Sequence, residues 1–134
     1  MLRSVLAVVA GLAVFFVVVS VLQGTMQQVY PPPPGFDPQD FAAVKRHIAG
    51  MPAGAFALLL GGYAVGGFCG GAVAAGIAVE RKLRAAAIVG GLTMLIGIAN
   101  FAMLPHPLWV VCVGVPLFVV AAVLGGQVGR LLSR

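Results

Sequence analysis

Four long apolar segments constrain the fold of this chain more than any other feature. They cover residues 5–22, 55–79, 85–104 and 108–132. Each matches the length of about 17–25 residues that an α-helix needs to cross the hydrocarbon core of a bilayer. Within them there is no Asp, Glu, Lys or His, and the one arginine, Arg130, lies near the end of the last segment. The sequence therefore predicts an all-α membrane protein, a single transmembrane domain with a bundle of four helices.

The composition excludes several other classes. Of the 134 residues, 61% are hydrophobic and 8% are charged, whereas soluble domains carry about 25% charged residues. The net charge of +5 comes from scattered residues without interleaved aromatics, so we expect no nucleic-acid partner. The two cysteines, Cys69 and Cys112, form no CxxC or Cys/His cluster, which argues against a disulfide framework or a zinc site. No cofactor is predicted, and membrane lipids are the expected partners.

The first segment has the basic start and apolar core of a signal peptide, but its core exceeds the usual 7–15 residues and no A-x-A site follows. We interpret it as a retained span. The distribution of basic residues then sets the orientation, because short cytoplasmic loops are rich in Lys and Arg. Lys45 and Arg46 fall on one side of the membrane. The other side, predicted to be cytoplasmic with both termini, has Arg3, Arg81, Lys82, Arg84, Arg130 and Arg134. The predicted location is a bacterial inner membrane.

The loop after the first span contains four consecutive prolines, residues 31–34. Proline lacks a backbone N–H and disfavours helix at the preceding residue, so the first helix must end by Tyr30. The run favours an extended polyproline rod, either as a spacer or as a PxxP docking site for a partner. A short interfacial helix is predicted over residues 38–49, capped by Asp37, started by Pro38 and ended by Gly50. Its apolar face would hold Phe41, Val44 and Ile48.

The second span is rich in small residues at intervals of four, the pattern of a glycine zipper. Such rows let helix backbones approach closely in lipid. Two interpretations remain open, tight packing within one bundle and an oligomer interface or pore-lining face. The predicted helix-packing residues are Gly62, Gly66 and Gly70, continued by Ala74 and Ala78, with a second row of Gly67, Gly71 and Ala75, and in the fourth span Ala121, Gly125 and Gly129.

Polar side chains inside the spans are few, and apart from Arg130 near the end of the last span none is ionised at neutral pH, which argues against proton-coupled transport. Tyr63 and Thr93 fall near mid-membrane, where one interhelical hydrogen bond is the simplest expectation. Pro116 predicts a kink in the fourth helix and leaves the carbonyl of Cys112 unpaired. We expect the Asn100 amide to point into the bundle and to bond main-chain groups near that kink, either directly or through a water.

His47 and His106 are the only histidines, and both are predicted on the outer side, where Trp109 would anchor the interface. Loop histidines without further ligands are common, so no metal site is predicted. The candidate ligand-binding residues are therefore Tyr63, Asn100 and His106. No nucleophile–base pair, carboxylate pair or HExxH motif is present, and no catalytic residue is predicted.

Three stretches, YPPPPGFD, GGYAVGGFCGGAVAAGIA and GIANFAMLPHPLW, together resemble a family of small, uncharacterised four-span bacterial inner-membrane proteins. The resemblance implies a proline-rich first outer loop and a Gly/Ala-rich second span. In those relatives a histidine often stands at the place of Tyr63, so any chemistry based on that histidine would not carry over. The family supplies no activity to transfer.

Two main functional hypotheses follow. The first is a non-enzymatic packing, accessory or assembly subunit that joins copies of itself or a larger membrane complex. The alternative is a small dimeric channel or transporter, although the embedded glutamate of small multidrug transporters is missing, as is the polar signature of fluoride channels. A weaker alternative is a binder of a lipid or quinone.

Overall fold

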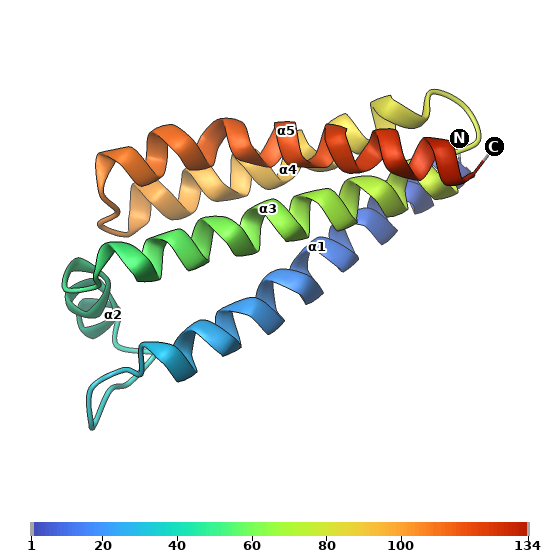
Figure 1. Ribbon diagram of the computed structural model, residues 1–134. Helices are drawn as coiled ribbons and strands as arrows, with labels where there is room; N and C mark the ends of the chain where they lie inside the picture. Colours follow the sequence, from blue (N-terminus) through green and yellow to red (C-terminus); the bar gives the residue numbers. More distant parts are fainter. Residues whose placement is uncertain (1, 134) are drawn as a thin grey trace.

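The computed structural model describes residues 2–133, which form five α-helices and no strand (Figure 1). Four of the helices are long and apolar enough to cross a membrane, and they pack side by side as a four-helix bundle. The chain is thus a multi-pass membrane protein. The fifth helix, α2, is short and lies at one end of the bundle. The bounds are Leu2–Val29 for α1, Phe41–Ala49 for α2, Ala53–Ile77 for α3, Lys82–Met103 for α4 and Leu108–Leu132 for α5.

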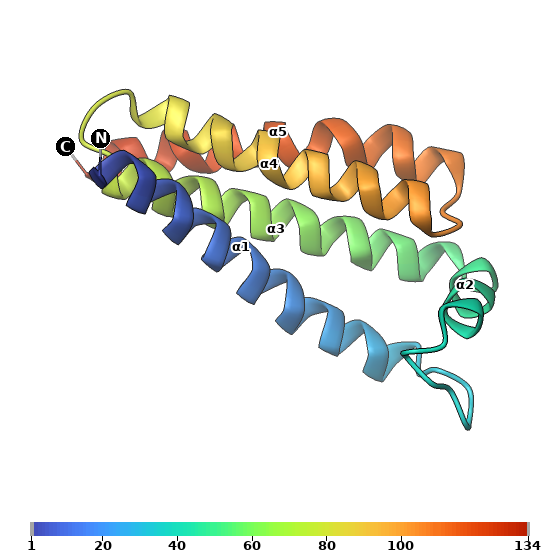
Figure 2. The same ribbon diagram turned by 180° about the vertical axis from the view of Figure 1, so that it is seen from behind.

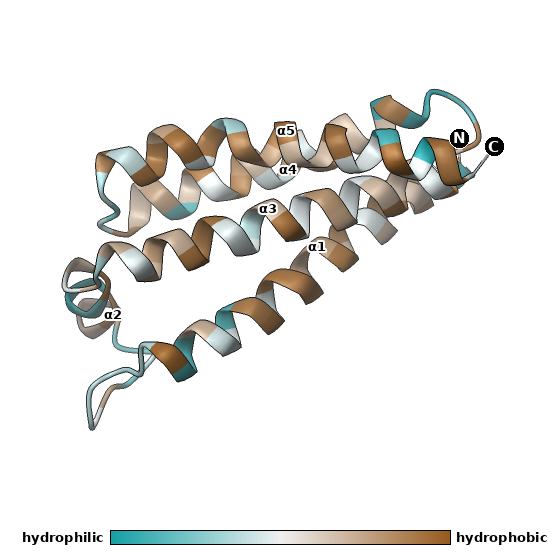
Figure 3. Cartoon of the chain, in the orientation of Figure 1, coloured by the Kyte–Doolittle hydropathy of each residue, from teal (hydrophilic) through white to brown (hydrophobic). Residues whose placement is uncertain are grey.

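The bundle has two chemically distinct ends. The start of α1, the end of α5 and the link between α3 and α4 lie together, while the proline loop and α2 lie at the opposite end (Figures 1 and 2). Colouring by hydropathy concentrates hydrophilic residues near these ends and leaves the middle of the helices largely apolar (Figure 3). We call the end with residues 31–34 the proline end. The opposite end is the basic end, with Arg3, Arg81, Lys82, Arg84 and Arg130.

Helix α1 is longer than its apolar segment, because the polar residues that follow the segment continue the helical hydrogen bonding. It continues through a polar stretch, where the Thr25 hydroxyl donates to the Val21 carbonyl at 3.2 Å, and it ends at Val29. The N–H of Tyr30 still donates to the Met26 carbonyl at 2.8 Å, and the prolines stop the helix there, as the sequence predicts.

Helix α2 is capped by Asp40, so the prediction that Asp37 would cap it and Pro38 would start it was wrong. The Asp40 carboxylate accepts hydrogen bonds from the N–H groups of Ala42 and Ala43 at 3.0 and 3.3 Å. The Asp37 carboxylate instead accepts from the Gln39 N–H at 2.9 Å. Residues 37–40 thus form a separate turn, and the helix starts three residues later than expected.

The core changes in size along the bundle axis. Near the basic end it consists of Ala7, Ala74, Ala78, Ala85 and Val89. Near the proline end it consists of much larger side chains, Phe15, Val19, Phe56, Leu60, Tyr63, Phe101, Val110 and Phe118. Small side chains let backbones approach and large ones hold them apart. Accordingly, α1 lies close to α3 near the basic end and diverges from it toward α2 (Figures 1 and 2).

Candidate functional site

Aromatic side chains form a continuous column through the half of the bundle nearer the proline end. Successive ring centroids are 4.8 to 6.5 Å apart, within the range of favourable aromatic pairs. All four long helices contribute, and the turn between α4 and α5 supplies a histidine. In order from mid-bundle outward, the aromatic column contains Phe15, Phe118, Tyr63, Phe101, His106, Phe56 and Trp109.

Tyr63 lies within this column, with only 7% of its surface exposed. Its ring is 4.8 Å from that of Phe118 and 6.3 Å from that of Phe101. The expected hydrogen bond with Thr93 is absent from the described residues 2–133. The Thr93 hydroxyl instead bonds the carbonyls of Val89 and Gly90 in its own helix, at 2.9 and 3.1 Å. A threonine within a helix commonly reaches back to the preceding turn, and that local bond prevailed.

His106 links Phe101 to Phe56 within the column. Its ring is 5.0 Å from Phe101 and 5.8 Å from Phe56. Its Nδ1 is 3.1 Å from the carbonyl oxygen of Leu104. Since a carbonyl only accepts, that hydrogen bond requires the proton on Nδ1. The imidazole is thereby fixed in the turn by one polar and two aromatic contacts.

Asn100 lies outside the aromatic column, and the direct bond expected between its amide and the main chain near Pro116 is not formed within residues 2–133. Both Cys112 and Pro116 lie on the exposed face of α5. The face of α4 that meets α5 carries Phe101, whose ring lies against Gly114. A shift of one position along an α-helix turns the side chain by about 100°, which separates Asn100 from that face. Helix α5 itself runs uninterrupted through Pro116.

Two glycine–phenylalanine pairs that the sequence analysis missed join α4 to α5. The ring of Phe118 covers Gly97, and the ring of Phe101 covers Gly114. In each helix the glycine and the phenylalanine are four residues apart and so share one face. Each helix therefore offers one hole and one knob to the other. The signal available in the sequence was this repeated Gly-x-x-x-Phe spacing in two consecutive spans.

The first row of small residues in α3 packs against α1. Gly70 lies against the backbone of Gly11, since a Cβ there would be 2.6 Å from the Gly11 carbonyl oxygen. Gly66 lies against Phe15 and Val19. Gly62 is looser, because a Cβ there would be an ordinary 3.6 Å from the Cβ of Leu22. The contact loosens toward the proline end, in keeping with the divergence of α1.

The second row in α3 packs against α5, backbone to backbone. A Cβ on Gly71 would overlap the carbonyl group of Ala122. In α5, a Cβ on Gly125 would overlap the carbonyl of Phe68, and one on Gly129 would overlap that of Ala72. The two adjacent rows of α3 thus contact two different helices of the same chain.

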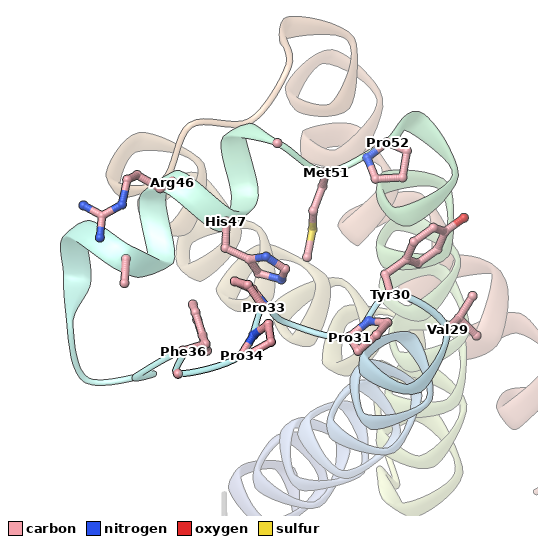
Figure 4. Close-up of a pocket in the computed structure, with 13 residues that line it drawn as sticks. Val29, Tyr30, Pro31, Pro33, Pro34, Phe36, Arg46, His47, Met51 and Pro52 are labelled. Carbon is pink, nitrogen blue, oxygen red and sulfur yellow. The ribbon is translucent and has the colours of Figure 1, made fainter.

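A hollow of about 690 Å³ lies at the proline end between the proline loop, α2 and the adjoining ends of α1 and α3 (Figure 4). The His47 ring projects into it toward Pro33, and the Met51 side chain points in from beside α3 (Figure 4). His47 also lies 5.2 Å from the ring of Phe36. The Arg46 guanidinium points away from the hollow (Figure 4). We call this surface the proline-loop hollow.

The two histidines do not form a common site. His47 lies against Phe36 in the proline-loop hollow, and His106 lies in the aromatic column. Among residues 2–133, no group of three or more His, Cys, Asp or Glu side chains is placed to hold a metal ion.

These features define a four-span helical membrane protein whose interior is occupied by aromatic rings and small residues. No family model, curated protein or solved structure significantly matches the chain.

Proposed function

We propose that this protein is a non-enzymatic accessory or assembly subunit of a bacterial inner membrane. In this proposal both termini are cytoplasmic, and α2 lies along the outer interface with the proline-loop hollow facing outward. The excess of basic residues at the basic end supports that orientation. The hollow then serves to contact a neighbouring membrane protein.

The observation that carries the proposal is the contrast between interior and surface. Inside the bundle, the polar candidates Tyr63 and His106 are held within the aromatic column. At the proline end, by contrast, rigid prolines and a capped helix enclose a hollow of about 690 Å³ that opens to the outside. A proline-lined surface loses little conformational entropy on binding, which favours its use for recognition.

The alternative of a dimeric channel or transporter receives less support. Its interface or pore lining would draw on the small-residue rows, but Gly66 and Gly70 lie against α1 and Gly71 lies against α5. The long helices also carry no carboxylate side chain that could relay protons.

Site-specific photocrosslinking in native membranes tests the assembly role. A benzophenone amino acid at Phe36 samples the proline-loop hollow, and the same group at Val17, which is 63% exposed on α1, samples lipid. We expect a protein adduct of defined mass only at position 36, abolished when Pro33 and Pro34 are both replaced by serine. Lipid adducts alone at both positions would argue against a protein partner.

Reconstitution addresses the alternative. Purified protein in liposomes should show no more flux of protons, potassium, fluoride or cationic drugs than empty liposomes. Substrate movement that depends on protein concentration would overturn the accessory role and establish the transporter.

A further inference from the structure

A second cavity, of about 230 Å³, lies at the basic end between the start of α1, the link after α3 and the first turns of α4. Its wall has two chemically different parts. The apolar part contains Val8, Ala85 and Ile88. The polar part contains Ser4, Glu80, Arg81 and Arg84. We call it the basic-end cavity.

The basic residues of this region have different neighbours. The Lys82 ammonium donates hydrogen bonds to the carbonyl and hydroxyl oxygens of Ser133, at 2.9 and 2.6 Å, and so ties the start of α4 to the end of α5. Arg81 and Arg84, on either side of it, line the cavity beside α1 instead. Of the basic residues in this link, only the two arginines therefore line the cavity.

The backbone at Arg81 supports a specific arrangement. Its φ of 49° is the only positive value among the non-glycine residues described. This left-handed conformation is unfavourable for a residue with a Cβ, and such residues concentrate at functional sites. The Arg81 carbonyl accepts from the N–H groups of Arg84 and Ala85, at 2.8 and 3.3 Å, so the same residue begins α4.

The two parts of the wall fit a phospholipid better than a soluble anion. Guanidinium groups bind phosphate oxygens through paired, charge-assisted hydrogen bonds. Val8 and Ile88 belong to membrane-spanning helices, and Ile88 is 42% exposed. An acyl chain can run along these side chains while the phosphate stays at the level of the arginines. A soluble anion would gain nothing from that apolar wall.

Glu80 narrows the choice of headgroup. Glu80 lines the same cavity as Arg81 and Arg84, and its negative charge would repel a headgroup that carries only negative charge. A headgroup with both a phosphate and a primary ammonium can pair its negative charge with the arginines and its positive charge with the glutamate. The cavity has room for about seven or eight water volumes at ~30 Å³ each, which suits a headgroup and not an entire lipid.

We propose that the basic-end cavity binds the headgroup of an aminophospholipid of the phosphatidylethanolamine type, with its phosphate on Arg81 and Arg84 and its ammonium on Glu80. The Ser4 hydroxyl supplies a further donor to the phosphate. This binding site is independent of the assembly role proposed for the opposite end of the molecule.

Native mass spectrometry of the full-length protein, titrated with single lipids in a mild detergent, tests the proposal. The probes are palmitoyl-oleoyl phosphatidylethanolamine, phosphatidylcholine and phosphatidylglycerol. Phosphatidylcholine keeps the charges of the first lipid but lacks ammonium N–H donors. We expect phosphatidylethanolamine to bind about tenfold more tightly than either other lipid, in line with a hydrogen bond between charged groups. Equal affinities for the three lipids would overturn the proposal.

Three variants separate the two subsites from general surface charge. Glu80→Gln should abolish the preference for phosphatidylethanolamine over phosphatidylcholine. Arg84→Gln should lower the affinity for both phosphatidylethanolamine and phosphatidylcholine by about tenfold. Arg130→Gln, an exposed arginine at the same end but outside the cavity, is the matched control and should leave lipid affinity unchanged. Similar losses in Arg84→Gln and Arg130→Gln would mean diffuse attraction and would refute the site.

A further variant and a competitor test the lipid itself. Ile88→Trp should occupy the space beside the apolar part of the cavity and so reduce lipid binding without altering any charge. Because Ile88 is partly exposed, the fold should tolerate the larger side chain. Millimolar inorganic phosphate should not displace phosphatidylethanolamine. Displacement by phosphate, or full lipid binding in Ile88→Trp, would show that the cavity takes a soluble anion and would overturn the proposal.

Discussion

The backbone of Gly71 in α3 lies directly against the carbonyl group of Ala122 in α5, in a space that no side chain could share. Gly76, five residues later in the same helix, has no atom within 4 Å of where a Cβ would stand, apart from its own neighbours and the surrounding turn of helix backbone. Helix α3 therefore contains one glycine in tight contact with another helix and one glycine with open space beside it. Comparing the same substitution at the two positions measures how much the close backbone contact contributes to stability.

Gly71→Ala should destabilise the bundle by about 1–3 kcal/mol, because the new methyl group must separate two backbones. Gly76→Ala should be neutral or slightly stabilising, since alanine favours helix over glycine by about 1 kcal/mol. Steric-trapping or thermal measurements of unfolding in detergent provide the comparison. Equal stability of the two variants would show that the contact between α3 and α5 is not tight.

Tyr63 should be replaceable by phenylalanine and not by alanine. No hydrogen bond of its hydroxyl exists within residues 2–133, so Tyr63→Phe should change the free energy of unfolding little. Tyr63→Ala removes about 100 Å³ of side chain, and at ~24 cal/mol per Å³ the cavity alone costs about 2–3 kcal/mol. A large loss of stability in Tyr63→Phe would instead assign the hydroxyl a polar role.

Asp40→Ala should loosen α2 while Asp37→Ala should not. The Asp40 carboxylate caps two N–H groups of the helix, and loss of such a cap costs about 1 kcal/mol. Hydrogen exchange of the amides in residues 43–49 should accelerate about fivefold in that variant. Asp37 bonds only the Gln39 N–H in the preceding turn and serves as the control. Equal exchange in both variants would show that the cap does not hold α2.

Reporter fusions test the orientation. A fluorescent protein that matures only in the cytoplasm should be active when fused after the last residue of the chain. Alkaline phosphatase, active only outside the inner membrane, should work when inserted in the loop of residues 31–34. The opposite pattern would reverse the topology derived from the basic residues.

The long helices were predictable, because length and lack of charge suffice to identify a span. Which helix packs against which face of another was not predictable. The prolines also fixed the end of α1 to within one residue. The choice between Phe101 and Asn100 as the residue that meets α5 depends on a rotation of about 100°, which apolar sequences do not encode strongly because nearly every face is hydrophobic. The cap of α2 was missed for a related reason, since Asp37 and Asp40 are chemically equivalent and only the turn between them distinguishes their roles.

The candidate site was predictable only in part. The sequence singles out Tyr63 and His106 as candidate ligand-binding residues, but their place in the aromatic column depends on Phe101 and Phe118, which look like ordinary apolar residues in a span. The spacing of four residues between Gly97 and Phe101 indicates that Phe101 faces another helix. That spacing becomes meaningful only when the matching pair in α5, Gly114 and Phe118, is placed opposite.

The change from alanines at one end of the core to phenylalanines at the other gives the molecule a taper. A body that is slender in one leaflet and broad in the other would displace unequal areas of lipid, and we expect such a wedge shape to favour a curved membrane. We therefore expect the protein to concentrate where the leaflet at the proline end is stretched. Its enrichment in small over large vesicles should depend on which way it is inserted.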